Sequence, residues 1–119
     1  AALRPTAAIS FEAWVYPTGL ALGVNQYIGG CGNTSFNGYI LYAYDATTIA
    51  WRIGKGDGAT ALEITANSIA NNAWYHVVGT FDGTTSRLYV NGVQVASSAA
   101  FSGNAIGYGA TTKFRIGQL

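Results

Sequence analysis

The chain has 119 residues, a length typical of a single domain with a core of its own. Only 9% of the residues are charged, against about 25% in an average soluble domain, and the formal net charge is +1. This balance excludes the basic footprint of a nucleic-acid-binding protein and a polybasic membrane patch. No apolar run reaches the length of a membrane-spanning helix, so we expect no membrane insertion. One cysteine, Cys31, excludes an intrachain disulfide and a multi-cysteine metal site.

Apolar and polar residues alternate at period two along most of the chain, which indicates strands rather than helices. The predicted strands cover, in chain order, residues 9–16, 26–29, 39–44, 49–53, 61–65, 75–81 and 86–90, then a hairpin return strand and an "RIG" strand near the end. About eight short strands joined by turns predict an antiparallel β-sandwich or jelly roll in a single domain.

The segment from residue 72 to residue 95 contains the clearest turn signals. Asn91–Gly92 is the preferred pair for a type I′ hairpin turn, because both positions need positive φ. Asp82–Gly83 is predicted to join the strands 75–81 and 86–90 in a meander. The hairpin pairing that follows is Val90 with Val93 and Leu88 with Val95, all four facing the core, with Tyr89 and Gln94 on the other face.

Three segments carry a family pattern: Phe11–Pro17 (FEAWVYP), Asn72–Gly83 (NAWYHVVGTFDG) and Arg87–Val95 (RLYVNGVQV). In order and spacing they resemble the "EAWV-x-P" strand, the "W-x-H-V-x-x-T-x-D-G" strand and turn, and the "L-Y-V-[DN]-G" hairpin of the laminin-G-like, concanavalin A-like jelly-roll family. The resemblance spans about residues 9–117 and implies an all-β, antiparallel β-sandwich.

Members of this family usually have one more strand before the first segment and another after the "RIG" strand. The resemblance therefore implies a sandwich that lacks a strand at each end. We expect residues 1–119 to be one laminin-G-like domain from a longer chain, or a domain whose sheet is completed by a neighbouring chain. Exposed strand edges of this kind favour homo-oligomers.

Catalysis is not expected. Glycoside hydrolases of this fold need two carboxyls close together, and the five carboxylates here are far apart in the sequence. Asp45 and Asp82 are predicted to bond backbone groups in turns. Glu12 is the carboxylate to suspect, because its neighbours are aromatic, but an outer-face position or an arginine partner explains it. His76 is predicted to be hydrogen-bonded in or near the core, as part of the same scaffold as Trp74.

The resemblance instead implies a recognition module that binds carbohydrate or protein ligands through its rim loops, as in lectins and cell-adhesion proteins. Aromatic rings suit the C–H faces of sugars, and Asn or Asp side chains suit their hydroxyls. The candidate ligand-binding residues are Asn37, Tyr44, Asp45, Asn104 and Tyr108. Such a module is expected to be extracellular, cell-surface or virion-associated. The alternatives are a structural or assembly domain with no soluble ligand and a relative of the glycoside hydrolases.

Some laminin-G-like domains hold Ca²⁺ at the rim. The positions here that correspond to its ligands are Asn37 and Asn104, both Asn instead of Asp. Because hard cations need oxygen ligands with enough charge, we expect no tight calcium site and no other cofactor.

Overall fold

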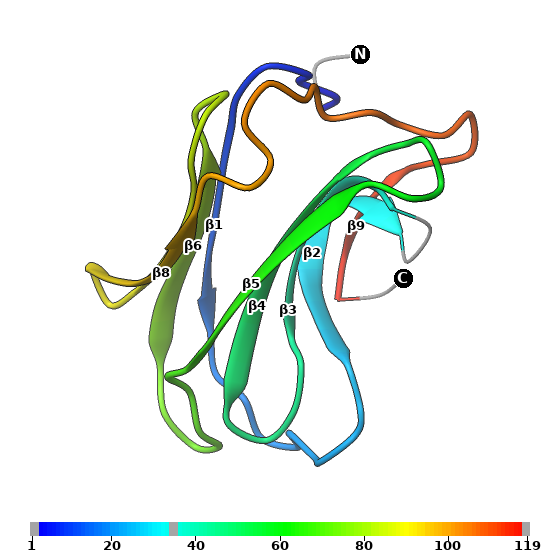
Figure 1. Cartoon of the computed structure of the whole chain (residues 1–119). Coiled ribbons are helices and arrows are strands. Elements are labelled where there is room, and N and C mark those ends of the chain that lie inside the picture. The colour runs from blue at the N-terminus through cyan, green and yellow to red at the C-terminus, as the bar shows by residue number, and fades with distance from the viewer. Residues whose placement is uncertain (1–2, 34–35, 118–119) are drawn as a thin grey trace.

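The structure is a computed structural model that describes residues 3–33 and 36–117. It is all-β, with two antiparallel sheets that face each other (Figure 1). The strands are β1 (Ile9–Val15), β2 (Gln26–Asn33), β3 (Asn37–Ala43), β4 (Thr48–Lys55), β5 (Ala61–Asn67), β6 (Tyr75–Phe81), β7 (Ser86–Val90), β8 (Val93–Ser98) and β9 (Phe114–Ile116). None of the described residues forms a helix long and apolar enough to cross a membrane.

The four-stranded sheet has the order β1-β6-β7-β8, and the five-stranded sheet has the order β5-β4-β3-β2-β9. The core fills the space between them. Trp51 of β4 and Phe81 of β6 are fully buried, as the alternation along each strand requires. Gly79 of β6 lies directly against the Trp51 ring, where a Cβ atom would overlap the indole. The backbone of one sheet therefore packs on the largest core side chain of the other.

The predicted meander is confirmed. The connection at Asp82–Gly83 joins β6 to β7, and the Asn91–Gly92 turn joins β7 to β8 with φ of 51° and 79°. The Asn91 side-chain oxygen also accepts a hydrogen bond from the backbone N–H of His76 (2.9 Å), and the backbone N–H of Asn91 donates to the His76 carbonyl (2.8 Å). These bonds fix the hairpin turn to the start of β6.

The predicted hairpin register is only partly correct. Val90 pairs with Val93 as expected, but an irregularity between Leu88 and Tyr89 places Ala96, not Val95, opposite Leu88. The expectation that Val93 faces the core is also wrong: its exposed fraction is 64%. The turn of this hairpin stands away from the facing sheet (Figure 1), and Val93 directly follows that turn. Tyr89 and Gln94 pair on the outer face as predicted.

The sandwich has two ends. The Asp45 end carries residues 16–25, 44–47, 68–74 and the turn 91–92; the Asp82 end carries residues 3–8, 56–60, 82–85 and 99–113 (Figure 1). Asp45, Asp57 and Asp82 each start a turn in the same way. In every case the carboxylate accepts the backbone N–H groups of the second and third residues that follow, at 2.7–2.9 Å. The predicted turn roles of Asp45 and Asp82 are confirmed.

Strand β1 forms one edge of the four-stranded sheet, and β9 forms one edge of the five-stranded sheet. In the described part of the chain, β1 pairs with β6 alone and β9 with β2 alone. The resemblance implies a further strand before β1 and another after β9 in the sequence. That the chain is a fragment, or is completed by a neighbour, stays a prediction.

Candidate functional site

The end of β1 alternates between the two faces of the four-stranded sheet. Phe11 and Val15 pack on the core, and the Phe11 ring centroid lies 6.0 Å from that of Tyr39. Trp14 is therefore turned outward and exposes 67% of its surface. Trp74, just before β6, exposes 62%. Such exposure is unusual, because tryptophan is normally largely buried.

Both tryptophans have aromatic neighbours. The register pairs Trp14 with His76, and their ring centroids are 5.1 Å apart with an interplanar angle of 33°. The Tyr16 and Trp74 rings are 5.4 Å apart at 53°. We call these four side chains the aromatic platform. Because Tyr16, just after β1, is two residues beyond Trp14, the two pairs lie side by side, about 7 Å apart along the chain.

The prediction that His76 lies in or near the core is wrong. Val77 takes the inward position and is fully buried, so alternation turns His76 to the outer face. There its Nε2 lies 3.4 Å from Oε2 of Glu12. Glu12 is on the outer face as predicted, paired with a histidine instead of an arginine. The pair holds the imidazole beside the indole, and the Glu12 side chain remains 70% exposed and able to accept from a ligand hydroxyl.

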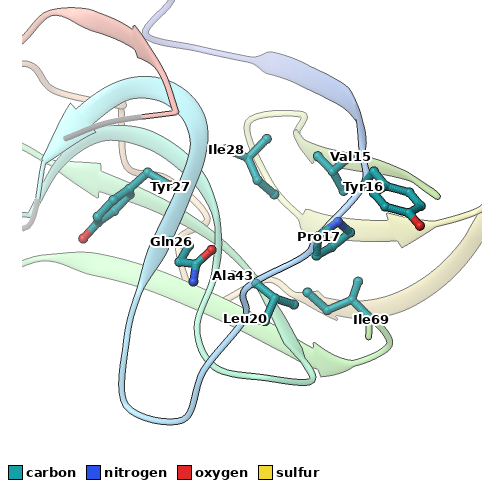
Figure 2. A pocket seen from close by; sticks show the side chains of 9 residues that line it. All are labelled: Val15, Tyr16, Pro17, Leu20, Gln26, Tyr27, Ile28, Ala43 and Ile69. Carbon is teal, nitrogen blue, oxygen red and sulfur yellow. The ribbon is translucent and has the colours of Figure 1, made fainter. Parts of the chain in front are cut away.

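A cavity of about 120 Å³ opens between the sheets at the Asp45 end. Figure 2 shows the lining residues, which come from β1, β2, β3 and two connections; the ring of Tyr27 points away from the others. Its lining consists of uncharged residues: Val15, Tyr16, Pro17, Leu20, Gln26, Tyr27, Ile28, Ala43 and Ile69. Tyr16 thus belongs to both the platform and the cavity, and joins the two into one continuous surface.

Three tyrosines line the outer face of the five-stranded sheet. The ring centroid of Tyr42 is 5.5 Å from that of Tyr27 and 6.4 Å from that of Tyr44. Tyr42 is buried, and its hydroxyl donates to Glu63. Burial, together with this hydrogen bond, raises the pKa of Tyr42 far above its usual range. Tyr44, exposed by 47%, is the accessible member of the row.

The sequence profile of the concanavalin A-like lectin/glucanases superfamily matches residues 1–119. The chain belongs to this superfamily. The identification of the family from its three segments is therefore confirmed, as is the all-β sandwich. No curated protein sequence matches the chain.

Among solved structures, the chain is similar to the binding domain of botulinum neurotoxin serotype D. The TM-score is 0.65 at 15% identity, over 92% of this chain and 27% of that chain. It is also similar to the Ruminococcus gnavus IT-sialidase CBM40 bound to α2,6-sialyllactose, with a TM-score of 0.54 at 13% identity, over 96% of this chain and 70% of that one. At such identities the likeness shows the fold alone. The chain spans about a quarter of the neurotoxin chain.

The five predicted ligand-binding residues of this concanavalin A-like chain do not form one site. Tyr44 and Asp45 lie at the Asp45 end, whereas Asn37, Asn104 and Tyr108 lie at the Asp82 end. The seven residues of β3 separate the two groups by about 20 Å, more than one sugar ring can bridge. Ligand binding by these residues stays a prediction.

Three of the five, Asn37, Asp45 and Tyr108, have contacts within the fold. The Tyr108 ring packs against the core, its hydroxyl donates to the Pro5 carbonyl (2.6 Å), and the Arg4 guanidinium lies over it. Burial raises the pKa of this phenol well above its usual range. The Asp45 carboxylate is engaged by the N–H groups of Thr47 and Thr48.

The carboxylates of this domain are dispersed. Glu12 and Glu63 lie on the outer faces of opposite sheets, and each of the three aspartates lies in its own turn. Retaining and inverting glycoside hydrolases both need two carboxyls facing one bond. The described residues offer no such pair, and the solved structures named above are binding domains rather than catalytic ones.

The described residues also contain no group of three or more His, Cys, Asp or Glu side chains suited to a metal ion. Of the two residues expected nearest to the calcium-ligand positions of the family, Asn37 accepts a hydrogen bond from the Thr112 hydroxyl (3.2 Å). Asn104 lies in the connection between β8 and β9. The absence of tight calcium binding stays a prediction.

Sequence reasoning missed the platform, although its signal was present. Alternation along FEAWV places Phe11 inside and therefore Trp14 outside, and alternation along WYHV places Trp74 and His76 on one face. The alternation could not show that these two sets of side chains lie next to each other on one solvent-facing surface. That depends on the pairing of β1 with β6, which is distant from it in the sequence.

Proposed function

We propose that this chain is a non-catalytic carbohydrate-binding module and that the aromatic platform is its binding surface. The observation that carries the proposal is the exposure of two tryptophans, Trp14 at 67% and Trp74 at 62%, beside each other on one sheet face. Indole rings offer a flat apolar surface against which the C–H face of a pyranose can stack. Large apolar groups left in water in this way mark interaction sites when they cluster.

The platform is ordered before any ligand binds. Trp14 rests against His76, which Glu12 holds, and Trp74 rests against Tyr16. A surface whose side chains are already fixed pays less conformational entropy on binding. The exposed Glu12 carboxylate and the His76 ring supply polar groups next to the indoles, which sugar hydroxyls require.

The solved relatives support a glycan ligand. One is bound to α2,6-sialyllactose, and another botulinum neurotoxin, of type C, depends for cell entry on two ganglioside molecules. That second structure has a TM-score of 0.55 at 10% identity, over 92% of this chain and 29% of that chain. By this proposal the chain works outside the cell or on a cell or virion surface, with modest affinity per module that multivalency raises.

The test is a glycan array followed by isothermal titration calorimetry of the strongest ligand. Trp14→Ala and Trp74→Ala are each expected to weaken binding about five- to tenfold, the value of one aromatic contact. Leu22→Ala is the control, because Leu22 is 86% exposed but lies outside the platform, and it should bind as the wild type does. Unchanged affinity in both tryptophan variants would refute the platform as the site.

A second candidate function is assembly with no soluble ligand. The observation that favours it is the edge of β1, which pairs with β6 alone within the described residues and carries Trp14 beside it. An unpaired strand edge next to apolar side chains can add a further strand from another chain. An empty glycan array combined with self-association of the protein would favour this candidate.

A further inference from the structure

The cavity at the Asp45 end is large enough for one substituent of a sugar ring but too small for the whole ring. Its volume of about 120 Å³ is somewhat below that of engineered cavities of about 150 Å³ that hold one benzene molecule. A pyranose with its hydroxyls has about twice as many heavy atoms as benzene and cannot enter. The lining has no charged side chain, so a carboxylate or ammonium would lose its hydration without compensation. A compact uncharged group fits.

The loop that forms one wall is fixed in place by hydrogen bonds on both sides. Asn71 accepts from the Leu20 N–H (2.9 Å) and donates to the Leu20 carbonyl (3.3 Å). The N–H of Asn72 donates to the Pro17 carbonyl (2.7 Å), and the Gln26 side chain donates to the Gly19 carbonyl (2.5 Å). The cavity is therefore a preformed feature of the fold.

The Gln26 amide defines the polar chemistry at the cavity. The Gly19 carbonyl can only accept, so the amide must present its Nε2 to the loop. Its Oε1 is then left as an acceptor, and no described residue donates to it. A ligand group that matches needs an N–H to donate to this oxygen and a small apolar part to fill the space lined by Ile28, Ala43 and Ile69.

We propose that the cavity binds the acetamido group of a 2-acetamido sugar, with the methyl group inside and the N–H donating to Gln26 Oε1. This inference rests on the proposed carbohydrate-binding function and specifies its ligand class. Tyr16 links the cavity to the aromatic platform, because it lines the cavity and packs against Trp74. One sugar is held at the cavity by its acetamido group, and the next along the glycan stacks on the platform.

The experiment compares two trisaccharides that differ only in this group: chitotriose, with acetamido substituents, and cellotriose, with hydroxyls. Burial of one methyl group and one hydrogen bond predicts about tenfold tighter binding of chitotriose to the wild-type protein. Ala43→Val grows into the cavity from a buried position and should remove that preference. Leu22→Ala should keep the preference.

A measurement on the unmodified protein guards against a variant that fails to fold. In saturation-transfer NMR of chitotriose with the wild type, the acetamido methyl protons should receive the most saturation. Equal affinity for both trisaccharides, each lost in Trp74→Ala, would overturn the acetamido inference and leave the platform intact. Preference for a 6-deoxy sugar, which has a methyl but no N–H, would overturn it too. Binding of neither trisaccharide overturns it, and an empty array then overturns the proposed function as well.

Discussion

At the scale of single residues, the same aspartate chemistry shapes three turns, and the turn at Asp82 adds a short ion pair with an arginine. Asp82 accepts the N–H groups of Thr84 and Thr85, and its Oδ2 lies 2.6 Å from the Arg87 guanidinium. The backbone N–H of Thr85 first, and the bond from Arg87 next, hold the pKa of Asp82 well below its usual range. Backbone and hydroxyl bonds from Thr60 lower the pKa of Asp57 to about 2. The turns are thus stabilised by ionised carboxylates.

The lowered pKa values of these aspartates determine the direction in which the stability of the fold changes with pH. A carboxylate whose folded pKa is lowered stabilises the fold fully above its unfolded pKa of about 4, and this contribution disappears as the pH falls through the folded value. The urea midpoint of the wild type should therefore fall between about pH 4 and pH 2. The urea midpoint of Asp82→Asn should be lower than that of the wild type at pH 7, and it should decrease less as the pH falls. Equal slopes for wild type and variant would contradict the role of Asp82.

The salt dependence of stability distinguishes the contribution of the Asp82–Arg87 ion pair from that of the hydrogen bonds in the turn. Added NaCl should narrow the difference in urea midpoint between Asp82→Asn and the wild type, because Arg87 is screened. Asp45→Asn is the matched control: Asp45 bonds two backbone N–H groups in the same way, without an arginine. Its difference from the wild type should change less with salt.

At the scale of elements, β6 faces both the core and the platform. Gly79 permits β6 to approach the Trp51 ring, and Val77 fills the core beside it, while His76 supports Trp14 on the other side. A displacement of β6 therefore affects the core and the proposed binding surface together.

Gly79→Ala tests this contact. The new methyl group would overlap the buried indole of Trp51, and overpacking of this kind costs about 1–3 kcal/mol. The urea midpoint, followed by tryptophan fluorescence, should fall accordingly. Gly19→Ala is the control, since nothing lies within 4 Å of a Cβ there and its stability should stay near that of the wild type. A Gly79→Ala protein as stable as the control would contradict the close packing.

Local signals predicted much of this element order. The bounds of β6 and β7, residues 75–81 and 86–90, and the Asn91–Gly92 turn were all readable, because alternation and turn chemistry are encoded within a few residues. The irregularity of the strand pairing after Leu88 could not be predicted from the sequence, because no local residue pattern marks it. The cavity could not be predicted either, because it forms where segments that are distant in the sequence leave a space between them.

At the scale of the whole molecule, the end of β1 serves both proposed binding features. Trp14 and Tyr16 belong to the platform, and Val15, Tyr16 and Pro17 line the cavity. The same strand is also the open edge of its sheet. With a net charge of only +1, repulsion between copies is weak, so association through this edge depends on what the strand itself carries.

Glu12 is the residue that opposes such association. If two β1 strands from two copies pair antiparallel over their full length from Ile9 to Val15, the two-fold axis falls at Glu12 and places one carboxylate opposite the other. Like charges directly opposite each other destabilise a strand pair by up to about 1 kcal/mol. Glu12→Gln should therefore strengthen self-association by up to about fivefold, measured by sedimentation velocity over a range of concentrations. Glu63→Gln, the same change on the outer face of the other sheet, should associate as the wild type does. If wild type and Glu12→Gln both sediment as 12.4 kDa monomers at all concentrations, pairing through β1 is wrong, and the open edge is compatible with a module that works as a monomer.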